Sequence, residues 1–367
     1  MDTQKGGIMF NRILVPLDGS SLAERAIPHA EQFARIFGSR IILLHVLNPV
    51  SYHENPISID PLNWQIRKAE ADIYMNRIAA RIREDLRESS LEDQDVQSKE
   101  KNKKKIQVEY SIREGKTAEN IVNFAHTENI DLLVISTHGA GGLSRWNLSS
   151  VTQKVINLIY LPVLIVRAYN QPEPEDARIH YRRILLPIDS SCRAECSLSA
   201  GIALARGEIS EELVPETKEH PVTPQPSSPP TKLILAAVIK PPEIPIPEPY
   251  PVEIEQLSQQ LMNISRQAVR DYLNEMKARL PVECEVRVLD NTGVSSAIQK
   301  LASQEEDIDL VILCAHGYTG QFAWPYGSVT RNYIEHGTKL VLVIQDIPRS
   351  QIQPTAAEIA IEKSGGR

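Results

Sequence analysis

The sequence predicts an α/β fold in two tandem domains, each with a parallel β-sheet covered by helices on both faces. The chain of 367 residues is long enough for two ordinary domains. It also repeats itself: RILVPLDGSSLAERA from Arg12 matches RILLPIDSSCRAECS from Arg183, and DLLVISTHGAGG from Asp131 matches DLVILCAHGYTG from Asp309. In both copies short apolar runs alternate with amphipathic stretches, which is the pattern of βαβ units.

The elements of the first copy follow from hydrophobic spacing. The apolar run 13–17 predicts a strand, 21–37 carries apolar residues at helical spacing, and the continuous run 40–49 is typical of a strand buried on both faces. The remaining elements are expected as a helix over 62–88, a strand over 106–115, a helix over 117–129, a buried strand over 131–137, a helix from about 149 and a last strand over 162–167.

The second copy has the same order, which places the domain boundaries. Twelve of the 25 prolines lie between Ile209 and Pro251, on either side of the strand KLILAAVIK, and predict two extended, mobile loops over 209–231 and 241–251. The expected divisions are an N-terminal tail 1–10, a first domain 11–168, a linker 169–181, a second domain 182–347 and a C-terminal tail 348–367.

Composition excludes several classes of partner. The formal net charge of −7 argues against a nucleic-acid binder, which usually presents a basic face. No run approaches the length of a membrane-spanning helix, and the N-terminus lacks the features of a signal peptide. Four cysteines in a chain of this size do not make a disulfide framework. We therefore expect a cytoplasmic protein without a membrane partner.

A glycine-rich turn follows the fourth predicted strand of each copy, with the pattern G-x-x-G, six residues, and then Gly or Ser before Ser-Val. Such a turn lets a ligand approach the main chain, and the next helix offers free amides to a phosphate. A bare tight turn is the alternative, but its repetition beside a strand–Asp–Ser segment favours a phosphate site. The predicted residues are Gly139, Gly142, Ser149, Ser150 and Val151, and in the second copy Gly317, Gly320, Gly327, Ser328 and Val329.

The segments ILVPLDGS, STHGAGGLSRWNLSSV, ILLPIDSS and CAHGYTGQFAWPYGSV together resemble the universal stress protein family. The resemblance covers most of both halves. It implies two tandem Rossmann-like (adenine nucleotide alpha hydrolase-like) domains with five parallel strands each, and binding of ATP or AMP, with or without Mg²⁺. By the same resemblance the phosphates would lie at the glycine turn, and the adenosine would contact a set of strand-end residues: Pro16, Asp18 and Val46, and Pro187, Asp189 and Val238.

One departure from the family pattern concerns the third glycine, which Gly327 keeps and Ser149 replaces. If that position needs a positive φ, the replacement costs on the order of 1 kcal/mol or more. If the residue only opens the helix, serine is harmless.

Histidines, cysteines and a GKT segment offer further candidates. His138 and His316 could reach a phosphate or be held by hydrogen bonds in the turn, and neither is assigned a catalytic role. Cys192 and Cys196 lie four residues apart on an expected helix, where half-buried thiols are favoured over a metal or redox pair. Cys314 is expected to be inert in its strand, and Thr117 of GKT is expected to cap a helix. No catalytic residue and no metal ligand is predicted.

Three classes of function remain: a nucleotide-binding regulatory protein of the stress-response type, which is favoured; an interaction scaffold with vestigial turns; and an ATP-hydrolysing enzyme. Without a convincing general base or metal-binding carboxylate pair, hydrolysis should be slow. The resemblance also implies pairing through the last strands, 163–167 and 340–345, as antiparallel neighbours in an intrachain pseudo-dimer. A further homodimer and an unknown signalling partner stay open.

Overall fold

The computed structural model describes residues 10–48, 61–92, 106–142, 148–169, 179–191, 193–207, 231–247, 249–305, 307–317 and 325–346. Within them the main division falls between residues 179 and 180, which separates two compact units. The expected loop 209–231 lies outside the described residues except for Thr231. The described part of 241–251 forms no strand or helix. No helix in the described ranges is both long and apolar enough to cross a membrane.

The first unit is built on five parallel strands in the order β3-β2-β1-β4-β5. Their bounds are Arg12–Leu17 (β1), Arg40–Leu47 (β2), Val108–Glu114 (β3), Leu132–Ser136 (β4) and Val163–Val166 (β5). The central strand β1 carries three completely buried residues in a row, Ile13, Leu14 and Val15, because helices cover it on both faces. The sequence prediction of a parallel sheet buried on both sides is thereby confirmed.

The helices of this unit are Ser21–Glu24 (α1), Ile27–Phe37 (α2), Pro61–Glu92 (α3), Thr117–Thr127 (α4) and Ser150–Leu158 (α5). The sequence predicted one helix over 21–37, but the structure divides it after Glu24. A continuous helix would need an amide at residue 28 to donate to the carbonyl of Glu24, and Pro28 has none. Proline is tolerated at the start of α2, where no intrahelical acceptor is available.

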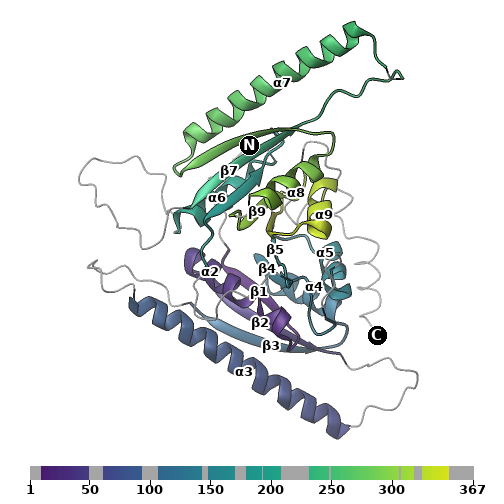
Figure 1. Ribbon diagram of the computed structural model, residues 1–367. Helices are drawn as coiled ribbons and strands as arrows, with labels where there is room; N and C mark the ends of the chain where they lie inside the picture. The colour runs from purple at the N-terminus through teal and green to yellow at the C-terminus, as the bar shows by residue number, and fades with distance from the viewer. Residues whose placement is uncertain are drawn as a thin grey trace, which may run out of the picture. The chain divides into compact units, whose positions relative to one another are not determined.

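The strand order explains how the helices cover both faces. From β1 through β2 to β3 the chain moves in one direction across the sheet, and from β3 to β4 and β5 it moves in the other. Since crossovers between parallel strands are right-handed, the two directions place their helices on opposite faces. Accordingly α2 packs against α3, and α4 packs against α5. Figure 1 shows the long helix α3 running along β3, which it contacts.

The second unit repeats this architecture with the order β10-β9-β6-β7-β8, again with all pairs parallel. Its strands are Arg183–Pro187 (β6), Lys232–Ile239 (β7), Cys284–Asp290 (β8), Leu310–Cys314 (β9) and Leu340–Ile344 (β10). Its helices are Cys196–Arg206 (α6), Val252–Arg279 (α7), Val294–Gln304 (α8) and Ser328–His336 (α9). The duplicated fold is therefore present in both halves, as predicted.

The amino-terminal edge of each sheet is tied by an aspartate that precedes the fourth strand. Asp131 Oδ2 accepts hydrogen bonds from the amides of Asn11 and Arg12 at 2.9 Å each. Asp309 Oδ2 accepts from the amides of Arg182 and Arg183 at 2.7 and 3.4 Å. Each carboxylate thus joins the start of its fourth strand to the start of the adjacent first strand, on the edge away from the predicted site.

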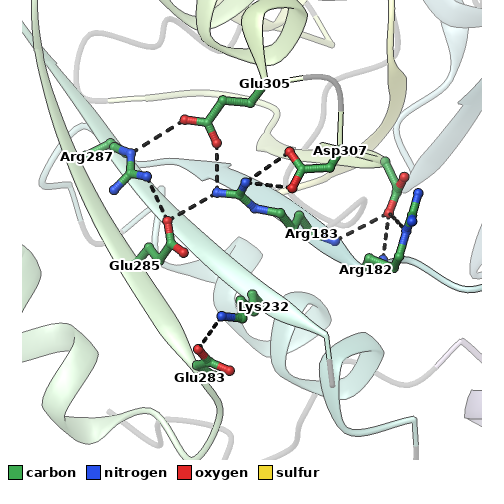
Figure 2. Close-up of polar contacts among 9 residues, drawn as sticks. Arg182, Arg183, Lys232, Glu283, Glu285, Arg287, Glu305 and Asp307 are labelled. Carbon is green, nitrogen blue, oxygen red and sulfur yellow. Dashed lines mark hydrogen bonds and ion pairs between the residues drawn. The ribbon is translucent and has the colours of Figure 1, made fainter. Parts of the chain in front are cut away.

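The second unit adds an ionic network around Arg183 at this edge (Figure 2). The Arg183 guanidinium, only 18% exposed, lies 2.8 Å from Asp307, 2.7 Å from Glu305 and 3.2 Å from Glu285. Arg287 contacts Glu285 at 2.8 Å and Glu305 at 3.6 Å, which closes the network. The hydrogen bonds from Arg183 lower the pKa of Asp307 below its ordinary value. The network therefore favours the charged form of Asp307 in the folded state.

The matching residue of the first unit, Arg12, pairs with one carboxylate among the described residues, that of Glu128, at 2.9 Å. We predict that Arg183→Met destabilises its unit by about 1–3 kcal/mol, because Asp307 loses the guanidinium that it bonds to and Glu285 and Glu305 keep only Arg287 of the network. Arg12→Met should cost under about 1 kcal/mol. Hydrogen exchange read on peptides of β6 and β1 measures both. Equal losses in the two variants would contradict the proposed role of the network.

The Asp307 part of this difference has a defined pH dependence. The folded-state pKa of Asp307 is lowered. Its contribution to the free energy of unfolding is therefore complete above the unfolded pKa of about 3.9 and disappears as the pH falls through the lower folded value. The gap between wild type and Arg183→Met should therefore narrow in that acid range.

Candidate functional site

Both sheets have a switch point, where the direction of chain progression reverses: between β1 and β4 in the first unit, and between β6 and β9 in the second. In open parallel sheets, ligands bind outside the carboxyl ends of the strands at this point. Asp18 follows β1 directly, and the turn that begins at Gly139 follows β4. The two segments singled out from the sequence are therefore brought together by the topology.

The carboxylate of Asp18 joins these segments. Its Oδ2 accepts a hydrogen bond from the amide of Ala140 at 2.8 Å, and its Oδ1 accepts from the amide and hydroxyl of Ser20 at 3.0 and 2.6 Å. A Cβ at position 139 would come within 2.0 Å of Oδ2. Gly139 thus leaves room for the Asp18 carboxylate, and its role in the approach of a ligand stays a prediction.

The second unit reproduces this contact at matching positions. Asp189 Oδ1 accepts from the amide and hydroxyl of Ser191 at 3.1 and 2.5 Å, and a Cβ on Gly317 would lie 2.2 Å from Asp189 Oδ2. The residue after the aspartate has a left-handed backbone in both units: Gly19 has φ +85° and Ser190 has φ +62°. Ser190 adopts a left-handed conformation that a non-glycine residue rarely takes. The hydrogen bonds between Asp189 and Ser191, on either side of it, hold it there. The turns 18–20 and 189–191 are called the aspartate hairpins below.

Neither aspartate is a helix N-cap. In the first unit the N-cap of α1 is Ser20, whose hydroxyl accepts from the amide of Ala23 at 3.2 Å and donates to Asp18. In the second unit Ser191 makes the same bond to the amide of Ala194. Both aspartates are exposed, so their carboxylates face solvent at the carboxyl ends of the strands while they hold the turn.

The second turn glycine differs in its function from the first. Gly142 has φ +87°, with no atom within 4 Å of the position a Cβ would take, and its amide donates to the carbonyl of Gly139 at 3.0 Å. Glycine is needed here for the backbone conformation and not for lack of space. Its counterpart Gly320 lies outside the described residues.

The departure at the third glycine position is harmless. Ser149 has φ −59° and Gly327 has φ −68°, so neither needs a left-handed conformation. Ser149 is the N-cap of α5, and its hydroxyl accepts from the amide of Thr152 at 3.1 Å. Gly327 caps α9 without a side chain. The Thr330 amide of the second unit consequently has no side-chain cap of the kind that Ser149 gives Thr152.

The first residues of these helices present their polar groups outward. Ser150 and Ser328 are exposed, and neither hydroxyl bonds to another described residue. Val151 and Val329 follow, both half-buried. The amides of these four residues have no intrahelical acceptor because they belong to the first turn. Among the described residues, each helix start therefore has two amides without an intrahelical acceptor and one hydroxyl without a partner.

Sequence reasoning missed a threonine that fixes each helix to the sheet. Thr152 Oγ1 donates to the carbonyl of Ser136 at 3.0 Å, and Thr330 Oγ1 donates to the carbonyl of Cys314 at 2.7 Å. Both acceptors are the last residues of their strands, so the threonine sets the position of the helix start over the strand end. The signal was present in the repeated Ser-Val-Thr, of which only the first two residues were interpreted.

A tyrosine–glutamate pair is a second duplicated feature that was missed. Tyr74 of α3 donates to Glu24 Oε1 at 3.0 Å, and Tyr272 of α7 donates to Glu195 Oε1 at 2.7 Å. Glu24 and Glu195 follow the aspartate hairpins at matching positions, so each long helix holds the segment that carries the aspartate. Burial, with the nearby Glu24 carboxylate, raises the pKa of Tyr74 well above its ordinary value.

The predicted adenosine-side residues lie at the carboxyl ends of two adjacent strands. Leu17 pairs with His45, so Asp18 and Val46 come next in register; Asp189 and Val238 correspond in the second unit when the β6–β7 register is continued. Val46 and Val238 are each the last residue but one of their strands. Both valines are half-buried, as are the motif residues Pro16 and Pro187.

Among the other candidates, His138 has the hydrogen-bonded surroundings given as one alternative, whereas Thr117 differs from its prediction. His138 is buried and its Nδ1 lies 3.1 Å from Thr137 Oγ1, while His316 is 2% exposed. Thr117 does not cap α4, whose N-cap is Lys116. Cys192 lies outside the described residues. In the described part of the chain, no group of three His, Cys, Asp or Glu side chains could hold a metal ion.

Comparison with known proteins identifies the family. The model of the universal stress protein family matches residues 9–167 and 227–345. The chain belongs to the universal stress protein family. It is a tandem member, because the match occurs once in each unit. Strand β6 and Asp189 fall outside the second matched segment, and their equivalence to β1 and Asp18 rests on the pairing of β6 with β7 and β9.

Individual relatives match one unit at a time. A universal stress protein of Methanocaldococcus jannaschii is 29% identical over 168 residues, which are 44% of this chain and 98% of the relative. One from Thermus aquaticus is 30% identical over 160 residues, 43% of this chain and 100% of the relative. Each relative is therefore nearly the length of one unit.

Solved structures share the fold. A universal stress protein from Archaeoglobus fulgidus covers 92% of this chain and 97% of its own, with a TM-score of 0.55 and 14% identity. Another universal stress protein was solved in complex with cAMP; it covers 44% of this chain and 99% of its own, with a TM-score of 0.30 and 19% identity.

Proposed function

We propose that each unit binds an adenine nucleotide, ATP or AMP, at the carboxyl edge of its sheet, and that the protein is a cytoplasmic regulator of the stress response. The observation that carries the proposal is the duplicated contact between aspartate and glycine turn at the switch point, beside an open helix start. Such an edge is where parallel α/β sheets bind ligands, and nucleotide binding is what the family resemblance implies.

The helix starts fit the phosphates. The free amides of Ser150 and Val151, and of Ser328 and Val329, point out of the first helical turn, where the helix dipole favours an anion. The exposed hydroxyls of Ser150 and Ser328 can donate to phosphate oxygens. A phosphate bound here would lie against backbone amides, so it needs no lysine or arginine from the turn.

The strand ends fit the adenosine. Val46 and Pro16 present half-buried apolar surface beside the exposed carboxylate of Asp18, and Val238, Pro187 and Asp189 do so in the second unit. Apolar surface with a few placed polar groups is the usual environment of a bound base. The proposed role is binding and signalling, without a catalytic group supplied by these residues.

Calorimetry of the full chain with ATP and with AMP tests the proposal. We expect binding to two sites, and we expect Asp18→Ala and Asp189→Ala each to remove or weaken one of them at least tenfold, because the carboxylate both faces the ligand and holds the turn. The proposal is refuted if neither ATP nor AMP binds, or if both variants give the same titration as the wild type.

A matched control separates ligand contact from loosening of the hairpin. Ser20→Ala removes the helix cap and one bond to Asp18 but leaves the carboxylate. It should lower stability by about 1 kcal/mol and keep most of the affinity. If Ser20→Ala weakens binding as much as Asp18→Ala, the aspartate acts only through the hairpin.

Exchanging the third glycine position between the units tests the phosphate assignment. Gly327→Ser installs a cap that competes for the Thr330 amide, and a Cβ there meets its nearest atom at an ordinary 3.4 Å. Ser149→Gly frees the Thr152 amide. We expect nucleotide affinity to fall in the first variant and rise in the second by roughly three- to tenfold, the effect of one charge-assisted hydrogen bond. Changes of the same sign in both would count against phosphate binding at the helix start.

We also propose that the two units pair through β5 and β10 as antiparallel neighbours. The support is the apolar sequence of both strands, which form the last positions in the strand order of their own units. An apolar edge strand left open invites association. The carbonyls of Pro162 and Val166 accept hydrogen bonds from the amides of Leu133 and Thr137, on the β4 side. The peptide groups of residues 163 and 165 therefore point away from β4.

Residues 1–170 alone should then dimerise through the freed edge of β5. Ile165→Pro removes an outward amide without touching the β4 ladder and should give a folded monomer, whereas Leu164→Pro removes an amide on the β4 side and should also lose stability. Sedimentation and circular dichroism measure these outcomes. A monomeric wild-type half at micromolar concentration would refute the pairing.

A further inference from the structure

Two cysteines of the second unit lie in contact. Cys196, the first residue of α6, and Cys314, the last residue of β9, have their sulfurs 3.2 Å apart. Cys196 is half-buried, and Cys314 is 7% exposed. The sequence favoured half-buried free thiols for Cys192 and Cys196 over a metal or redox pair, and it predicted an inert Cys314. The fold instead brings together two thiols that are separated by more than a hundred residues.

The pair is not a requirement of the fold. In the first unit the matching positions are Arg25, which donates to the carbonyl of Ala168, and Ser136, whose hydroxyl lies 3.5 Å from the amide of His138. The same sheet, turn and helix therefore form without either thiol. The second unit thus has two neighbouring thiols at positions where the first unit has none.

We propose that Cys196 and Cys314 form a reversible dithiol–disulfide pair that responds to hydrogen peroxide. The half-exposed Cys196 meets the oxidant first: its thiolate attacks one peroxide oxygen, the O–O bond breaks, and with one proton a water molecule leaves, so that Cys196 becomes a sulfenic acid. The thiol of Cys314 then attacks that sulfur, the S–S bond forms, and the sulfenic oxygen leaves as a second water. Two thiols lose two electrons in total, and one peroxide is reduced to two waters.

The geometry favours closure over further oxidation. A disulfide has a sulfur–sulfur distance of about 2.05 Å, so the two sulfurs need to approach by only roughly 1 Å. The resolving thiol is already in contact with Cys196 when the sulfenic acid forms, and further oxidation by a second peroxide must compete with this neighbour. A disulfide is thus the expected product.

The bridge would join the two segments that flank the switch point. Asp189 lies seven residues before Cys196, and Gly317 lies three residues after Cys314. The carbonyl of Cys314 also accepts from Thr330, which positions α9, and Glu195 beside Cys196 accepts from Tyr272 of α7. Oxidation would therefore fasten the surroundings of the Asp189 hairpin to the turn. This pair forms whether or not a nucleotide binds there.

Thiol counting and peptide mapping of the purified full chain test the proposal. One equivalent of hydrogen peroxide per chain should remove two of the four thiols, and a non-reducing digest should contain a peptide pair joined through Cys196 and Cys314 whose mass is lower than the sum by two hydrogens. Dithiothreitol should restore both thiols. A bridge between Cys192 and Cys196, a bridge between two chains, or sulfinic acid on Cys196 as the main product would each overturn it.

Variants in the same chain supply the controls. Cys192→Ser should leave the bridge intact. Cys284 is 5% exposed and burial raises the pKa of its thiol, so it should remain reduced in wild type. Cys314→Ser, which carries the serine found at the matching position of the first unit, should convert peroxide-treated Cys196 to higher oxidation states instead of a disulfide. Retention of a Cys196 disulfide in that variant would refute the pairing.

Discussion

The contact between an aspartate carboxylate and a glycine backbone is the constraint on which the rest of each unit's carboxyl edge depends. Asp18 and Asp189 fit only because residues 139 and 317 have no side chain: a Cβ there would lie 2.0 or 2.2 Å from the carboxylate oxygen. This contact joins the end of the first strand to the turn after the fourth. The serine that bonds to each aspartate extends the connection into the next segment, so a single carboxylate orders both sides of the switch point.

The two ends of the parallel strands have separate functions in this protein. The amino-terminal edge is closed by Asp131 and Asp309 and, in the second unit, by the network around Arg183. The carboxyl edge instead keeps exposed carboxylates, free hydroxyls and unpaired helix amides. Parallel pairing makes this separation possible, because all five strand ends of one kind lie at the same edge. Stability can then be concentrated at one edge while the groups proposed to bind a ligand remain available at the other.

Duplication preserved the contacts that shape the edge and changed residues around them. Both units contain the same four contacts: the aspartate–glycine contact, the aspartate hairpin, the tyrosine–glutamate pair, and the bond from a threonine to the strand end. Two features differ between the units. The helix cap is Ser149 in the first unit and Gly327 in the second. The first unit has Arg25 and Ser136 where the second has Cys196 and Cys314. The two sites are therefore alike in construction but unequal in free amides and in thiol chemistry.

The sequence by itself determined the duplication, the parallel strands and the segments that form the edge, because hydrophobic period, proline and glycine act locally and recur in both copies. It could not determine which atoms meet across the switch point. Gly139 was singled out for the approach of a ligand, and the neighbour that the structure places beside it is a carboxylate 121 residues earlier in the chain. Likewise the contact of Cys196 with Cys314 and the negative φ of Ser149 became known only from the folded backbone. Such contacts depend on the register and crossing of distant strands, which only the tertiary structure decides.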